Sequence, residues 1–223
     1  MDADPGRRES LREQIYADLL RRLQLSEFGP EDRLVDTEVA AAWGASRMPA
    51  REALLRLVND GYLRGTTRGF VVPSLTMQEV RDIFEVRRLL EPRAVAHAAR
   101  DLTPEAACAL GAAQAAAQAA AAAQDVRGMI AANIAFRGAW LACVRNDRLR
   151  ATINRFVDHV QTVRLETLRR ADTRSVVVEG LGAIREALVA RDPVAAADQM
   201  TLFIGAAEAA FFAARSAQIA EAP

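Results

Sequence analysis

Two arginines one helical turn apart, Arg47 and Arg51, are the side chains of this sequence best suited to bind an anionic polymer. The planar fork of a guanidinium group matches phosphate oxygens and the O6 and N7 atoms of guanine. Ser46 is a candidate N-cap whose hydroxyl can accept from the first amides of a helix. Pro49 falls in the first turn, where a missing N–H breaks no helical bond. We therefore expect both arginines near the positive end of a helix.

The segments around this pair predict a helix-turn-helix followed by a hairpin. Apolar residues recur at helical spacing in 10–25 and again after Pro49. A short helix is expected from Thr37 to Trp43 and is ended by Gly44, which gives two helices joined by a tight turn. Further on, two short β-prone runs, Tyr62-Leu63-Arg64 and Phe70-Val71-Val72, flank Gly65-Thr66-Thr67-Arg68-Gly69 and predict a hairpin with Arg68 at its tip.

Residues 10–72 resemble the winged helix-turn-helix of GntR-family transcription regulators. The resemblance rests on Arg33-Leu34, Glu38-Val39-Ala40, Ser46-Arg47-x-Pro49-x-Arg51-Glu52-Ala53-Leu54, Gly61-Tyr62-Leu63 and Arg68-Gly69-Phe70-Val71. It implies that the two helix arginines, the residues between them and the wing glycine contact double-stranded DNA. The DNA-binding residues expected on this basis are Arg33, Ser46, Arg47, Met48, Arg51, Arg68 and Gly69.

The charge of the whole chain does not indicate a nucleic-acid partner, because 29 basic residues balance 29 acidic ones. The local balance is different. Between Ser46 and Gly69, five arginines stand against Glu52 and Asp60, which leaves a net charge of +3. Counterion release from DNA phosphates would favour binding by this segment.

The other chemistry-bearing residues do not form an enzymatic pattern. Cys108 and Cys143 are isolated, which indicates neither a disulfide framework nor a zinc site. No Cys/His pair, Ser/His/Asp set or carboxylate pair stands out, so an enzyme is disfavoured. We expect no signal peptide, and residues 106–124 are too rich in Ala and Gln to be expected to span a membrane. We expect a cytoplasmic protein without a membrane partner.

After a linker at 74–76, the sequence predicts an all-α domain. Thr76-Met77-Gln78-Glu79 is a capping box. Helices are expected at 77–100, 104–124, 126–144, 147–171, 175–190 and 193–215. Alanine is the best helix former, so the Ala-rich tract is expected to be helical, with disorder as the alternative. The predicted fold is mainly α, with a winged helix-turn-helix over 1–73, a bundle of about six helices over 77–215 and a tail at 216–223.

Two arginines fall inside the apolar stripes of this predicted bundle. Arg87 and Arg137 each have large apolar residues three, four and seven positions away, and Asn133 lies one turn before Arg137. A buried guanidinium group needs an anion. For Arg87 that anion could be Glu91, four residues later on the same helix. The other interpretation is a bundle cavity that binds a carboxylate or a phosphate.

Residues 77–215 resemble the FCD effector domain of the FadR-like subfamily, in its shorter VanR-type length. The matching segments are Glu85-Val86-Arg87-x-x-Leu90-Glu91-Pro92, Asn133-x-x-Phe136-Arg137, Arg145-Asn146-Asp147-x-Leu149, Ile184-x-x-Ala187-Leu188-x-x-Arg191-Asp192 and Ala196-Ala197-x-x-Met200. Many FCD domains hold a divalent metal with an Asp or Asn and three histidines. Here Arg137 stands at one histidine position, and Gly180 and Phe203 fall near the other two. The comparison therefore implies no metal and no cofactor.

These features together predict a repressor or activator that binds a pseudo-palindromic operator as a homodimer. Arg87, Asn133 and Arg137 are the predicted effector site for a small organic acid, with His159 and Arg164 as further candidates. The alternative is a regulator whose degenerate C-terminal domain only dimerises and binds no effector.

Overall fold

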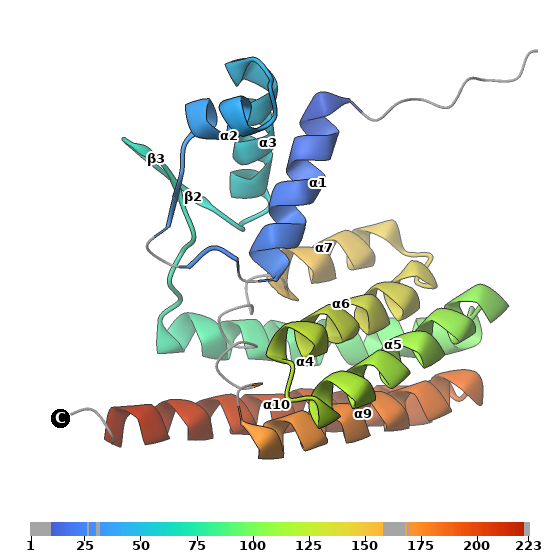
Figure 1. The fold of residues 1–223 in the computed structure, drawn as a ribbon. Coiled ribbons are helices and arrows are strands. Elements are labelled where there is room, and N and C mark those ends of the chain that lie inside the picture. The colour runs from blue at the N-terminus through green and yellow to red at the C-terminus, as the bar shows by residue number, and fades with distance from the viewer. Residues whose placement is uncertain (1–9, 26, 30–31, 158–167, 169, 221–223) are drawn as a thin grey trace, which may run out of the picture. The chain divides into compact units, whose positions relative to one another are not determined.

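Helices dominate the chain, and a small three-stranded sheet lies in its N-terminal part (Figure 1). The computed structural model describes residues 10–25, 27–29, 32–157, 168 and 170–220. Contacts divide the chain into two compact units, Met1–Ser74 and Leu75–Pro223. The predicted fold class, mainly α with a winged helix-turn-helix followed by a helical bundle, is confirmed. None of the described helices is both long and apolar enough to cross a membrane.

The described residues of the first unit form three helices and three short strands around one core. In chain order they are α1 (Leu11–Gln24), β1 (Arg33–Leu34), α2 (Asp36–Ala42), α3 (Arg47–Asn59), β2 (Arg64–Thr66) and β3 (Gly69–Val71). Ser10 and Glu13 form a capping box at the start of α1. The core is built by apolar residues at helical spacing on α1 and α3, closed by side chains from α2 and the strands: Ile15, Leu19, Leu23, Leu34, Ala40, Ala50, Ala53, Leu54, Leu57, Leu63 and Phe70.

The sheet has the order β1-β3-β2, and both strand pairs are antiparallel. The hairpin of β2 and β3 was predicted from the sequence, although its first strand begins at Arg64 rather than at Tyr62. Strand β1 was not predicted, because two residues are too short to show an alternating pattern. It pairs Arg33 with Val71 and Leu34 with Phe70, and so fixes the wing to the segment that precedes α2.

The start of α3 differs from the prediction in one respect. Ser46 occupies the N-cap position with extended backbone, but its hydroxyl makes no capping hydrogen bond in the described first turn. The physical reason is Pro49. It stands at the third helical position, which usually supplies the N–H that a capping hydroxyl accepts, and proline has no N–H to donate.

The second unit is a bundle of long helices. The described helices are α4 (Met77–Arg100), α5 (Pro104–Ala122), α6 (Val126–Ala142), α7 (Asp147–Val157), α9 (Ala171–Val189) and α10 (Pro193–Ala220). Figure 1 shows α5 running alongside α6, and α9 alongside α10, in agreement with their contacts. Thr76, Thr103 and Asp125 cap the first three of these helices with side-chain oxygens. The Ala-rich tract is helical, with Ala113, Ala117 and Ala120 buried on one face.

Two predicted helix boundaries in this unit were wrong. The sequence predicted one helix over 147–171 and the next from 175, but α9 already begins at Ala171, after Arg170 in an extended conformation. Arg170 pairs with Asp172 in the first turn of α9, where a carboxylate is favoured by the helix dipole. Helix α10 continues to Ala220 rather than ending at residue 215. The segment 158–167 lies outside the described residues.

Candidate nucleic-acid interface and effector cavity

Asp36 holds together the two arginines at the start of α3. Both of its carboxylate oxygens accept from Nη2 of Arg47, at 3.2 and 3.1 Å, and Oδ2 also accepts from Nη1 of Arg51 at 3.3 Å. The Asp36 side chain is only 7% exposed, whereas those of Arg47 and Arg51 are 67% and 60% exposed. One buried carboxylate therefore orients two guanidinium groups that remain open to solvent.

The charge state of Asp36 follows from this arrangement. The hydrogen bond from Arg47 is the largest cause that lowers the pKa of Asp36, with a further contribution from Arg51, while burial acts in the opposite direction. The carboxylate is thus ionised at neutral pH. The sequence prediction missed Asp36. The sequence feature that could have identified Asp36 is an acidic residue in the first turn of the short helix that precedes the arginine-bearing helix.

The exposed side chains at the start of α3 are of the kinds that read base edges. Met48, between the two arginines, is 69% exposed, and Ser46 is exposed as well. Arginine forks suit guanine, and an apolar side chain suits the methyl group of thymine. The structure brings Ser46, Arg47, Met48 and Arg51 together at one end of one helix, and their role in DNA binding stays a prediction.

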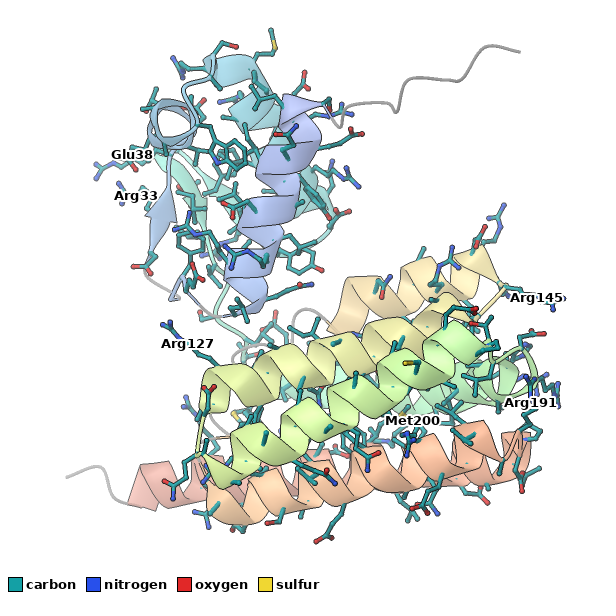
Figure 2. All side chains as sticks on the ribbon, turned by 45° about the vertical axis from the view of Figure 1, so that its right-hand side comes forward. Arg33, Glu38, Arg127, Arg145, Arg191 and Met200 are labelled. Atoms are coloured by element: carbon teal, nitrogen blue, oxygen red, sulfur yellow. The ribbon has the colours of Figure 1, made fainter. Side chains whose placement is uncertain are left out.

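Three further predicted residues lie in the wing and on the strand that pairs with it: Arg68, Gly69 and Arg33. Arg68 is exposed in the turn between β2 and β3, and its backbone N–H donates to the hydroxyl of Thr66 at 3.3 Å. Gly69 has a φ of +130°, and a Cβ at this position would lie 2.7 Å from the Leu34 carbonyl oxygen. Only glycine lets β3 approach β1 in this way. Arg33 is exposed on β1 (Figure 2). Its Cγ would lie 3.3 Å from a Cβ at Gly69.

In the second unit, the three predicted effector-binding residues line one cavity. Arg87 comes from α4, and Asn133 and Arg137 come from α6. The cavity has a volume of about 60 Å³. Met200 on the inner side of α10 contributes to its wall and is 2% exposed (Figure 2). The remaining lining is mostly aromatic and aliphatic: Phe84, Phe136, Trp140, Leu168, Val176, Val177, Leu181, Ile184, Phe203 and Ala207, with Glu91 and Thr173 as the other polar residues.

Both interpretations of Arg87 have a counterpart in the structure. Its Nε donates to Oε1 of Glu91 at 2.8 Å, so the internal ion pair exists, and the two side chains are 10% and 3% exposed. Glu91 nevertheless lines the same cavity as Arg87. Arg137 donates from Nη2 to the carbonyl oxygen of Ile153 at 3.3 Å, which ties α6 to α7 while leaving the guanidinium group on the cavity wall.

The residues present do not fit a divalent metal of the kind found in many FCD domains. Phe203 occupies the space in front of Gly180, since a Cβ on Gly180 would lie 2.4 Å from Cδ2 of the Phe203 ring. Gly180 and Phe203, which stand near two of the expected ligand positions, offer no ligand atom, and the cation Arg137 lines the cavity. Among the described residues, no group of three His, Cys, Asp or Glu side chains could hold a metal. His159 and Arg164, the additional candidates, lie outside the described residues.

Comparisons with known proteins agree with this two-part organisation. Residues 11–72 match the family "Bacterial regulatory proteins, gntR family", and residues 82–206 match the FCD domain. The chain is 39% identical over 83 residues to the uncharacterized HTH-type regulator YdhC of Bacillus subtilis, covering 37% of each protein. It is 37% identical over 97 residues to the HTH-type regulator McbR of Escherichia coli, covering 43% of this chain and 44% of McbR.

The matches to these curated relatives therefore span only about four tenths of their length. The solved structure of E. coli McbR/YncC extends the similarity over nearly the whole chain. It superposes with a TM-score of 0.82 at 26% identity, covering 92% of this chain and 99% of McbR/YncC. The similarity thus includes both the winged unit and the helical bundle.

Proposed function

The chain belongs to the GntR family of DNA-binding transcriptional regulators and carries an FCD domain, and from this premise we propose that it binds a pseudo-palindromic operator as a homodimer and responds to a small organic acid. One helix end reads only a few base pairs. Two copies on a two-fold symmetric site double the contacts and give useful specificity.

The observation that carries the DNA-binding part is the paired, exposed presentation of Arg47 and Arg51 by Asp36. A guanidinium group that is already oriented loses less conformational freedom when it binds than a flexible one. Because the carboxylate is shared, each arginine keeps further N–H donors for a phosphate or a base. In this proposal α3 enters the major groove with its N-terminal end, and the wing with Arg68 approaches the backbone.

The effector part is supported by the placement of Arg87, Asn133 and Arg137 on one small cavity in the bundle. A carboxylate between the guanidinium groups would form charge-assisted hydrogen bonds in a site largely shielded from water. The acid shifts the protein between DNA-competent and incompetent states only if it binds one of them more tightly. A carboxylate-binding cavity also distinguishes this proposal from a C-terminal domain that only dimerises.

The proposal can be tested by selecting DNA from a randomised duplex library with the purified full-length protein. We expect an enriched site with two-fold symmetric half-sites about one helical turn apart. Sedimentation of the complex should give two protein chains per duplex. An enriched site without symmetry, or one chain per duplex, would contradict the homodimer. Adding an acid that binds the protein should change the affinity for the selected site.

A further inference from the structure

The charge inside the effector cavity is smaller than its two arginines suggest. Among the described lining residues, the ionisable side chains are Arg87, Arg137 and Glu91, whose charges sum to +1. The Glu91 side chain is 3% exposed, and its Oε1 lies 2.8 Å from Nε of Arg87. Water screens little of this negative charge, since buried groups interact through a low dielectric. The described wall can therefore neutralise one carboxylate but not two.

The rest of the lining restricts the body of the ligand. Four aromatic rings, from Phe84, Phe136, Trp140 and Phe203, share the wall with aliphatic side chains, and Asn133 and Thr173 are its neutral polar residues. A second charged or strongly hydrated group would have to give up water without a partner, which is costly. The volume of about 60 Å³ is also far below the roughly 300–1,000 Å³ of pockets for drug-sized ligands.

We propose that this cavity binds a compact monocarboxylate with an apolar body, and that Glu91 excludes acids with a second negative charge. The inference rests on the proposed effector function and narrows its ligand class. A ligand carboxylate would accept hydrogen bonds on the side of Arg87 and Arg137. The methylene or methyl groups would then lie against the aromatic rings. By Coulomb's law, the charge of Glu91 alone would weaken the binding of a second charge about 6 Å away by roughly 100-fold. This is an upper value, because the guanidinium group of Arg87 beside Glu91 offsets part of the repulsion.

Butyrate, succinate and butyramide form a matched set of probes with four carbon atoms each. Succinate replaces the terminal methyl of butyrate by a second carboxylate, and butyramide replaces the carboxylate by a neutral amide. The chain contains two tryptophans, and Trp140 lines the cavity whereas Trp43 packs against the core of the other unit. The full-length Trp43→Phe variant therefore reports binding in the cavity through Trp140 fluorescence alone.

At pH 7.5 and constant ionic strength, we expect butyrate to give a saturable change in Trp140 fluorescence. Succinate should bind more weakly than butyrate, by up to about 100-fold, and butyramide should give no saturation. Adding Glu91→Gln should reduce the preference for butyrate over succinate to less than about tenfold, because the repelling charge is gone. If this variant does not fold, the comparison of the three probes on the Trp43→Phe protein still tests whether the cavity prefers a monocarboxylate to a dicarboxylate.

Succinate binding as tightly as butyrate would overturn the inference and leave the effector site in place. Butyramide matching butyrate would overturn carboxylate recognition in the cavity. If none of the three probes saturates, the compact monocarboxylate is excluded. A panel of larger acids, scored by their effect on operator affinity, then tests the proposed effector function independently.

Discussion

Replacing Arg51 by alanine tests whether the start of α3 reads DNA. The fold should tolerate the change. The Arg51 side chain is 60% exposed, and Asp36 keeps both hydrogen bonds from Arg47 when Arg51 is removed. Exposed ion pairs contribute about 0–1 kcal/mol. We therefore expect Arg51→Ala to unfold at nearly the same temperature as the wild type, so that any loss of DNA binding reflects the interface.

The expected loss in affinity follows from the number of half-sites. A bidentate contact between arginine and guanine is worth about 1–3 kcal/mol. A homodimer would lose this contact twice, about 2–6 kcal/mol, which corresponds to a Kd weakened by roughly 30-fold to 20,000-fold. If Arg51 contacts phosphates instead, binding should weaken equally on all sequences. The slope of log K against log salt would then fall by about 2.

Fluorescence anisotropy on the selected duplex, at several salt concentrations, measures both quantities. Arg56→Ala is the matched control, because Arg56 lies on the same helix but packs over the Tyr16 ring at 3.9 Å and pairs with Asp60. We expect its affinity to stay within about threefold of the wild type, since it is directed into its own unit. If Arg51→Ala binds the duplex as tightly as Arg56→Ala, the assignment of the DNA-reading end is refuted.

Three further substitutions test other parts of the structure. Asp36→Asn should weaken operator binding, because the guanidinium groups lose their shared anchor, and anisotropy would show it. The pKa of Asp36 is lowered in the folded state, so its ion pairs stabilise the fold at pH values above the unfolded pKa of about 3.9, and this stabilisation is lost as the pH falls through the folded pKa. The free energy of unfolding in urea, followed by Trp43 fluorescence in a Trp140→Phe background, should therefore fall less at acidic pH for Asp36→Asn than without this substitution. Equal pH profiles would contradict the linkage. Gly69→Ala should displace the wing, because a φ of +130° is strained for alanine and the new Cβ would lie 2.7 Å from the Leu34 carbonyl oxygen. The backbone amide of Phe70 should then exchange its hydrogen faster with solvent. An unchanged exchange rate would contradict the prediction. Gly180→Ala should lower the free energy of unfolding by about 1–3 kcal/mol, because the new Cβ would clash with the Phe203 ring. Adding Phe203→Leu should recover part of that stability. If thermal denaturation shows that the two substitutions destabilise the protein additively, the contact is disproved.

The elements that the sequence predicted well are those with strong local signals. The capping box at Thr76 marked the start of α4, and apolar spacing identified the buried faces of α1 and α3. The failures have physical causes. A two-residue strand such as β1 has no periodicity, and its partner β3 lies far away in sequence. At Ser46 the residue type favoured a cap, but the proline three positions later removed the donor.

The cavity in the helical bundle could be predicted only in part. Arg87 and Arg137 stood out because charged residues interrupt an apolar stripe, and the structure places both on the same cavity. The opposite wall, formed by residues of α9 and α10 such as Thr173 and Met200, had no such signal. Apolar residues on a helix do not reveal which neighbouring helix they face. The fit of Phe203 against Gly180 also requires the packing of two helices to be known.

The two buried carboxylates show why local charge counts are incomplete. Counting from Ser46 to Gly69 gives +3, yet Asp36, outside that window, shares its charge with both arginines at the start of α3. There the arginines stay exposed, so a phosphate can compete for donors that Asp36 has oriented. Glu91 also pairs with an arginine, but that pair is buried and lowers the charge available to a ligand. A carboxylate–arginine pair therefore has different consequences in the two units. Where the arginines are exposed, as at Asp36, the pair orients them for an anionic partner. Where the arginine is buried, as at Glu91, the pair lowers the charge that a ligand can neutralise.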